Sequence, residues 1–132
     1  MTEKLIEELD LANGLTISFY DCSRKIAGDR WYVKLVARIP ISVDENAFVK
    51  AGAEPDLFKE FLDATEGMVT FELQKERNFI DEQEKDQVFN EILSNIKEHA
   101  LNYLSHKEFA PKFLKKEIQS FLERRKWYQN NP

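Results

Sequence analysis

The stretch Trp31–Val43, WYVKLVARIPISV, decides the fold class of this chain. Its residues alternate between two sets, and the apolar set consists of Trp31, Val33, Leu35, Ala37, Ile39, Ile41 and Val43. Successive side chains of a β-strand point to opposite faces, so this alternation predicts a long strand with one buried face. The other face must meet water or a binding partner, and it carries Tyr32, Lys34, Val36, Arg38, Pro40 and Ser42.

The residues before this strand predict a hairpin. Two apolar sets of three flank the break Ala12-Asn13-Gly14, namely Leu5, Leu9, Leu11 and Leu15, Ile17, Phe19. A three-residue loop would place Leu9 opposite Ile17 and both sets on one face, with Gly14 where positive φ is favoured. Residues 3–12 also fit a short helix, and both alternatives stay open. With the strand, residues 1–43 form a three-stranded meander.

Three helices and a fourth strand are predicted after Val43. Residues 44–54 are an excursion, and residues 54–66 form a helix with Pro55 in its first turn and Gly67 as its stop. Residues 68–76 alternate again and form the fourth strand. Residues 82–128 hold two helices with a joint at 105–110. The first of these, about twenty residues long, is expected to start at a capping box of Asp81 and Glu84.

The resulting order is β-β-β-α-β-α-α. It predicts an α+β two-layer sandwich, with a mostly antiparallel four-stranded sheet and the helices packed on one face. The position of the fourth strand, beside the third or the first, stays open. At 132 residues, 42% of them hydrophobic, the chain is expected to form a single domain over residues 1–132.

The charge of the chain is unevenly distributed. The net charge is −5, but residues 107–132 carry seven basic and three acidic residues, a net +4. The remaining residues carry twelve basic and 21 acidic residues, a net −9. This distribution argues against general nucleic-acid binding. An acidic N-terminus without a signal peptide, the lack of an apolar run of membrane-spanning length, and the single Cys22 predict a cytoplasmic protein.

No motif in the sequence predicts an enzyme, a metal site or a cofactor. The usual phosphate-loop, nucleophile-elbow and zinc motifs are missing. His99 and His106 are the only histidines, and two ligands do not make a zinc site. Cys22 would need a neighbouring base to act as a nucleophile. An enzyme is therefore the third hypothesis, and no catalytic residue is assigned.

The segment Asp21–Arg30, DCSRKIAGDR, is the richest in polar chemistry. It supports the second hypothesis, a regulatory domain that binds a small molecule or nucleotide. The candidate ligand-binding residues, including one from the central strand, are Asp21, Ser23, Arg24, Lys25, Asp29, Arg30 and Arg38.

The leading hypothesis is a non-catalytic binding module whose partner is another protein or a second copy of the chain. Two surfaces are candidates: the open face of the sheet and the basic C-terminal helix. On the open face we expect Thr16, Ser18, Tyr20, Tyr32, Lys34, Val36, Arg38, Thr70, Glu72 and Gln74. The candidate partner-binding residues are Tyr20 and Tyr32 on this face, and Arg124, Arg125, Lys126 and Trp127 near the chain end.

Overall fold

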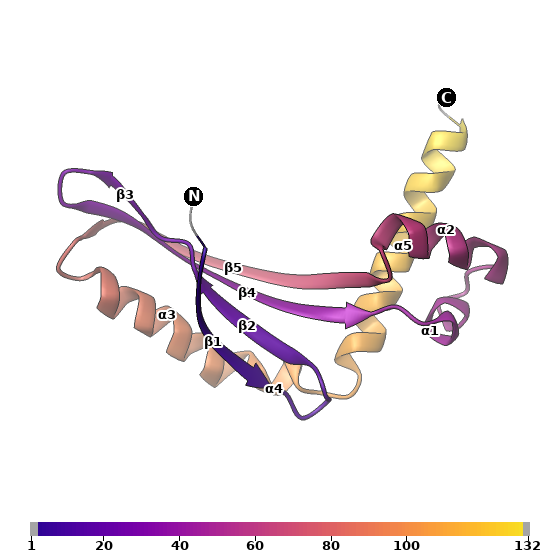
Figure 1. Cartoon of the computed structure of the whole chain (residues 1–132), viewed down its shortest axis with the longest axis horizontal. Helices are drawn as coiled ribbons and strands as arrows, with labels where there is room; N and C mark the ends of the chain where they lie inside the picture. The colour runs from indigo at the N-terminus through magenta and orange to yellow at the C-terminus, as the bar shows by residue number, and fades with distance from the viewer. Residues whose placement is uncertain (1–2, 131–132) are drawn as a thin grey trace. The chain divides into compact units, whose positions relative to one another are not determined.

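The structure, a computed structural model, describes residues 3–130 and has an α+β two-layer fold (Figure 1). The strands are β1 (Lys4–Asp10), β2 (Thr16–Asp21), β3 (Arg24–Ala27), β4 (Arg30–Ser42) and β5 (Met68–Asp81). The helices are α1 (Glu45–Lys50), the 3-10 turn η1 (Pro55–Leu57), α2 (Phe58–Thr65), α3 (Lys85–His99), α4 (Leu101–Leu104) and α5 (Phe109–Asn130). The predicted fold class is confirmed, and within residues 3–12 the segment Lys4–Asp10 is a strand rather than a helix.

The sheet has five strands where the sequence predicted four. β1 pairs with β2, β2 with β4, and β3 and β5 also pair with β4. The predicted fourth strand therefore joins beside the predicted third, and it extends to Asp81. The additional strand is β3, which lies inside the segment expected to be a loop. A two-residue turn at Gly28 and Asp29 folds it back onto β4, and Gly28 has a φ of 57°.

The hairpin of β1 and β2 is confirmed except at its open end. Leu9 lies opposite Ile17, the N–H of Leu11 bonds to the carbonyl of Leu15 at 2.7 Å, and Gly14 has a φ of 89°. A register shift between Leu5 and Glu7 places Leu5 opposite Tyr20. One extra residue in a strand reverses the face of every residue beyond it. Leu5 therefore lies on the open face, 48% exposed, and not in the core as expected.

The described chain forms two compact units. The sheet unit contains residues 3–39 and 72–106, and the helical unit contains residues 40–71 and 107–130. The strands β4 and β5 each contribute residues to both units. The prediction of a single domain over residues 1–132 stays a prediction.

The core of the sheet unit lies between the sheet and α3, which runs along one face of the strands (Figure 1). From the sheet, Ile17, Phe19, Val33, Leu35 and Ala37 are fully buried. The helix contributes a buried stripe consisting of Phe89, Ile92, Leu93 and Ile96. An ion pair of 2.7 Å between Lys97 of α3 and Glu7 of β1 joins the two layers. The predicted strand alternation is thus confirmed, and the buried residues of α3 recur at helical spacing.

The predicted start of the first C-terminal helix is wrong. Asp81 ends β5 instead of capping the helix, and its carboxylate accepts the N–H of Gln83 at 2.9 Å. The helix α3 begins at Lys85 without a side-chain cap. It has 15 residues rather than about twenty, because the chain turns at Ala100 before the short α4.

The helical unit is built around an aromatic cluster. Phe48, Phe58, Phe61 and Phe121 form a chain of ring contacts with centroids 5.1 to 5.6 Å apart. Phe48 comes from α1, a helix in the region expected to be an irregular excursion. The Asp44 carboxylate caps this helix by accepting the N–H of Ala47 at 2.7 Å. The predicted helix 54–66 is present as η1 followed by α2.

Candidate functional site

The open face is the side of the sheet unit opposite α3. In the described part of this unit no helix covers it (Figure 1). Register pairs place Tyr20 beside Val36 and Ser18 beside Arg38, so the predicted face is confirmed for β2 and β4. Its polar and aromatic residues are Glu3, Glu8, Asp10, Ser18, Tyr20, Arg24, Tyr32, Lys34, Arg38, Glu72, Gln74 and Glu76.

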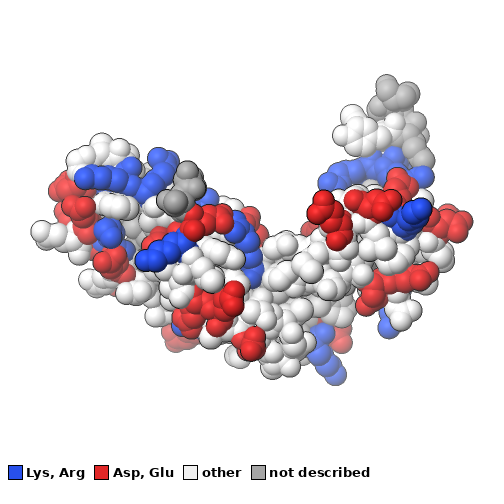
Figure 2. Space-filling model, viewed as in Figure 1, with Lys and Arg blue, Asp and Glu red and all other residues white. Residues whose placement is uncertain are grey.

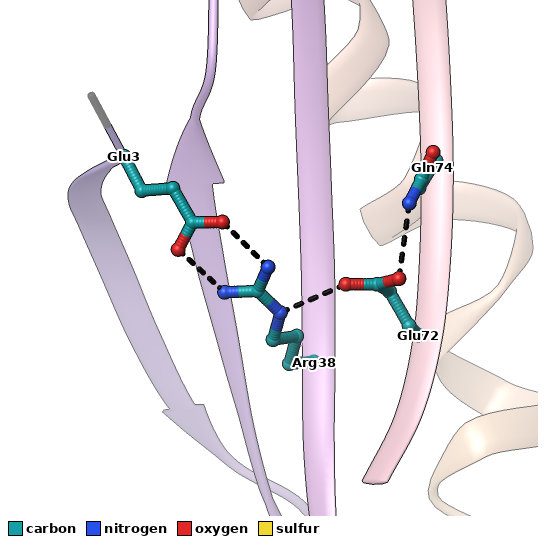
Figure 3. Close-up of polar contacts among 4 residues, drawn as sticks. All are labelled: Glu3, Arg38, Glu72 and Gln74. Atoms are coloured by element: carbon teal, nitrogen blue, oxygen red, sulfur yellow. Dashed lines mark hydrogen bonds and ion pairs between the residues drawn. The ribbon is translucent and has the colours of Figure 1, made fainter. Parts of the chain in front are cut away.

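Arg38 is the centre of a hydrogen-bonded network on this face (Figure 3). Its Nη1 and Nη2 donate to the two carboxylate oxygens of Glu3, at 2.7 and 2.6 Å. Its Nε donates to Oε1 of Glu72 at 2.9 Å, and Nε2 of Gln74 donates to the other oxygen of Glu72 at 3.0 Å. Bidentate arginine–carboxylate pairs combine strength with fixed geometry. One guanidinium therefore links β4 to β5 and to the residue that precedes β1.

The protonation states of these groups follow from the network. The pKa of the Arg38 guanidinium is raised, mainly by its hydrogen bonds to Glu3 and secondly by its hydrogen bond to Glu72. The same bond lowers the pKa of the Glu3 carboxyl below its usual range. The pKa of Glu72 is lowered by its bond to Arg38 first and by Gln74 second. All three groups are thus held in their charged forms.

Two arginines lie over tyrosine rings on the open face. The guanidinium carbon of Arg38 is 5.0 Å from the ring centroid of Tyr20, and that of Arg24 is 5.2 Å from that of Tyr32. The hydroxyl of Tyr32 also donates a hydrogen bond to the carboxylate of Glu76, which raises the pKa of the phenol. Tyr20 and Tyr32, the two predicted partner-binding residues of the sheet, are therefore both fixed by arginine and strand contacts.

An apolar residue is buried beneath this polar layer. Val36 points to the open face, opposite Tyr20, yet it is only 2% exposed. Leu5 lies on the other side of Tyr20 and is half exposed. The open face therefore contains one apolar position, Val36, that is shielded from solvent, which distinguishes it from a plain solvated surface.

The charge balance of the open face is acidic. Three basic residues, Arg24, Lys34 and Arg38, are outnumbered by five acidic ones, Glu3, Glu8, Asp10, Glu72 and Glu76. The open face therefore carries a net negative charge. Nucleic-acid binding depends mainly on basic residues that neutralise phosphates.

The predicted ligand-binding residues of segment 21–30 do not come together as one site. The Asp21 carboxylate accepts the N–H of Ser23 at 2.9 Å, and the Ser23 hydroxyl accepts the N–H of Lys34 at 3.0 Å. These two residues shape the chain between β2 and β3. Arg30 binds Asp81 at 2.9 Å and lies 3.9 Å from Asp29. Lys25 lies opposite Trp31, whereas Arg24 and Arg38 reach the open face.

Asp21 and Ser23 do line a cavity of the sheet unit, together with Glu3 and Leu5 near the start of β1 and residues at the start of α3. Its volume is about 660 Å³, and Trp31, Lys85 and Phe89 are among the other lining residues. The ammonium of Lys85 is 4.8 Å from the Trp31 ring centroid. The cavity combines apolar walls with charges of both signs.

Cys22 is buried, whereas His99 is exposed. Cys22 is 2% exposed, and burial raises the pKa of its thiol, so the thiolate needed for attack is disfavoured. His99 is exposed on α3, 3.9 Å from the Glu98 carboxylate. Within residues 3–130 no group of three His, Cys, Asp or Glu residues is placed to hold a metal ion. None of the helices described is long and apolar enough to cross a membrane.

The predicted residues of the C-terminal helix lie in the helical unit. Arg125 forms an ion pair of 3.0 Å with Glu60 of α2. Arg124 and Arg125 line a groove between α2 and α5, and Lys126 and Trp127 follow them on α5. Tyr128, which also lines this groove, is a residue that the sequence interpretation did not select, although it directly follows Trp127.

Glu3 is the member of the Arg38 network that sequence reasoning missed. Its position depends on the register shift in β1, because an unshifted strand would place it on the opposite face. No residue type near Ile6 marks that shift.

No protein-family model matches this chain, and neither the curated proteins nor the solved structures compared with it give a match. Its function is therefore inferred from its own residues.

Proposed function

We propose that this protein is a non-catalytic interaction module that binds a protein partner through the open face of its sheet unit. The observation that carries the proposal is the pair of arginine-over-tyrosine contacts, Arg38 with Tyr20 and Arg24 with Tyr32, on a face without a helical cover. Tyrosine and arginine are enriched among the residues that dominate protein–protein binding energies.

The ion pairs of the open face favour binding by reducing its entropic cost. Immobilising a flexible side chain at an interface costs roughly 0.5–1.5 kcal/mol. Arg38 is already held by Glu3 and Glu72, and Tyr32 is held by Arg24 and Glu76. A partner would therefore meet side chains that have lost much of their freedom on folding. The net negative charge of the open face, with three basic and five acidic residues, supports a protein partner rather than a nucleic acid.

The experiment is a pull-down from lysate of the native cell with two matched double variants. The face variant is Arg24→Glu with Tyr32→Ala, and the control is Lys112→Glu with Tyr103→Ala, which makes the same charge reversal and the same tyrosine truncation at exposed positions of α5 and α4. We expect the wild type and the control to recover the same partner and the face variant to lose it. Equal recovery by both variants, with unchanged melting temperatures, would refute the proposal.

A second candidate function is small-molecule binding in the cavity of the sheet unit. The supporting observation is its volume of about 660 Å³, which lies in the range of small-molecule sites, together with Asp21, Ser23 and Lys85 in its wall. The test is native mass spectrometry of the purified protein. A small bound mass that is present in the wild type and lost in the Ser23→Trp variant would support this candidate. The mass of the chain alone in the wild type would count against it.

We also propose a cytoplasmic location. The support is the single buried Cys22, whose free thiol is typical of a reducing compartment.

A further inference from the structure

The strand β5 has a free edge that the proposed function does not use. In the described chain β5 pairs with β4 alone, so the backbone N–H and C=O groups along its other edge meet no strand. Within the sheet unit this edge runs along Glu72–Asn78, where every residue except Leu73 is exposed. It ends at Phe79, whose φ of 60° departs from extended backbone. At about 3.3 Å per residue, the free edge is roughly 20 Å long.

The other free edges of the described sheet are short or irregular. The outer strand β1 has a register shift between Leu5 and Glu7, and β3 has one between Lys25 and Ala27. Bulges and short strands protect an edge from pairing with a further chain. The stretch Glu72–Asn78 is therefore the free edge best suited to accept another strand.

A groove lies beside this edge, between β5 and α3. Its volume is about 330 Å³, and it is lined by Lys75, Arg77, Val88, Glu91, Ile92 and Asn95. Every second side chain of a strand added to β5 would point to the α3 side of the sheet, where the groove lies. In strand addition, main-chain hydrogen bonds provide the affinity and pockets for alternate side chains provide the specificity. The edge and the groove together supply both.

The groove is suited to apolar and acidic side chains. Its α3 wall includes Val88, which is half-buried, and Ile92, which is 5% exposed. Its β5 wall carries Lys75 and Arg77, both exposed, and among the described residues no ion pair engages either of them. The acidic lining residue Glu91 accepts a side-chain hydrogen bond from its own helix at 3.2 Å. Two cations are thus available to pair with an incoming carboxylate.

A second copy of the chain does not match the charges of this edge. A two-fold axis would pair β5 with itself in antiparallel orientation, with residues of the same face opposite each other. An axis at Gln74 places Glu72 opposite Glu76, and an axis at Lys75 places the two copies of Lys75 opposite each other. An axis at Glu76 places Lys75 opposite Arg77. Each central register therefore opposes like charges, which destabilises the pairing.

A nucleic acid does not match the edge either. Figure 2 shows acidic and basic side chains mixed on the visible side of the sheet unit, whereas phosphate binding relies on clustered basic residues. A nucleic acid also has no peptide groups that could continue the ladder of the sheet. An extended polypeptide meets both requirements of the edge.

We propose that Glu72–Asn78 of β5 takes an extended segment of a protein partner as an additional strand of the sheet. The segment carries an apolar side chain that packs on Val88 and Ile92. Two residues away it carries an acidic side chain that pairs with Lys75 and Arg77. This inference goes beyond the proposed function, since the edge and the groove lie outside the arginine–tyrosine contacts of the open face.

The test is selection from a phage-displayed library of random ten-residue peptides on the immobilised full chain. We expect the enriched peptides to share an apolar and an acidic residue two positions apart. Their Kd, measured by fluorescence anisotropy, should rise about tenfold or more for Lys75→Glu with Arg77→Glu. The control Lys112→Glu with Lys116→Glu, a double charge reversal at exposed positions of α5, should leave it unchanged. A selection without such a pattern, or equal binding by two variants of wild-type melting temperature, would overturn the proposal.

N-methylated forms of the selected peptide test strand addition on the wild-type chain. Methyl groups on alternate backbone nitrogens remove the donors of one edge of the peptide and leave those of the other. Only one edge of an added strand faces β5, so one methylated form should lose binding and the other should keep it. Equal effects of the two forms would refute strand addition. The face variant Arg24→Glu with Tyr32→Ala should still bind the peptide, so a failure here is distinguishable from failure of the proposed function.

Discussion

The two faces of β4 show how one strand serves two purposes. On the side of α3, Val33, Leu35 and Ala37 are fully buried in an apolar core. On the open face, Lys34 and Arg38 alternate with them, and Arg38 is hydrogen-bonded to the carboxylates of Glu3, just before β1, and Glu72 of β5. The first face is held by burial and the second by directional contacts. Burial dominates the free energy of folding, whereas surface ion pairs contribute little to it and fix geometry instead.

The comparison predicts the largest effect at Leu35. Leu35→Asp places an unpaired carboxylate in the core and is expected to cost more than about 4 kcal/mol, abolishing cooperative unfolding. Lys34→Asp, the same new residue one position earlier on the open face, should leave a cooperative transition. Urea denaturation followed by circular dichroism measures both. A soluble Leu35→Asp variant with a normal transition would show that the two faces are assigned the wrong way round.

Val36 tests whether the open face is more than a solvated surface. Although it points away from α3, it is 2% exposed, so Val36→Ala is expected to cost about 1–3 kcal/mol. A residue on a simply hydrated face would cost less than about 0.5 kcal/mol. Chemical denaturation distinguishes the two values. The smaller one would mean that the side chains around Tyr20 do not shield this position.

Arg38→Gln is expected to have a smaller effect, on the order of 1 kcal/mol, because its ion pairs are partly exposed to solvent. The Arg38→Gln variant should also recover less of the partner in the pull-down, since Glu3 and Glu72 would then face each other without a cation between them. Denaturation of wild type and variant in parallel measures the first effect. A cost similar to that of Leu35→Asp would contradict the division between the two faces.

The difference between wild type and Arg38→Gln should also depend on pH. Arg38 lowers the pKa of Glu3 and Glu72 from their ordinary value of 4.5. A carboxyl whose pKa is lowered by folding contributes stability above its unfolded pKa, and this stability is lost as the pH falls through the folded pKa. We expect the difference to be constant from neutral pH down to about 5 and to shrink well below 4.5. A constant difference across this range would exclude the ion pairs as its origin.

Much of the fold could be predicted from the sequence because its signals are periodic. The alternation of β4, the hairpin around Gly14 and the stripe of α3 each repeat over many residues, so one face is specified redundantly. The elements that were missed are short. β3 consists of four residues, all exposed, and shows no alternation. α1 consists of six residues, too few to display a helical period. Both form because of their neighbours: β3 pairs with β4, and α1 buries Phe48 in the aromatic cluster.

The candidate site was predictable where it depends on strand parity. Tyr20, Tyr32 and Arg38 were expected on one face and do lie there. Glu3 was not, because its side depends on the shift at Ile6. Segment 21–30 shows the opposite case: its polar residues are adjacent in the sequence but do not all converge, since β3 sends neighbours to opposite faces and Asp21 and Ser23 bind the backbone.

The measurement that tests the central claim most directly is photo-crosslinking in the native cell. A photoreactive phenylalanine analogue would replace Tyr20, Tyr32 or, as control, Asn90 on the exposed side of α3. If the open face is the docking surface, Tyr20 and Tyr32 positions should give the same crosslinked protein and Asn90 should give none. Crosslinks from Asn90 alone, or from no position on the open face, would contradict the account.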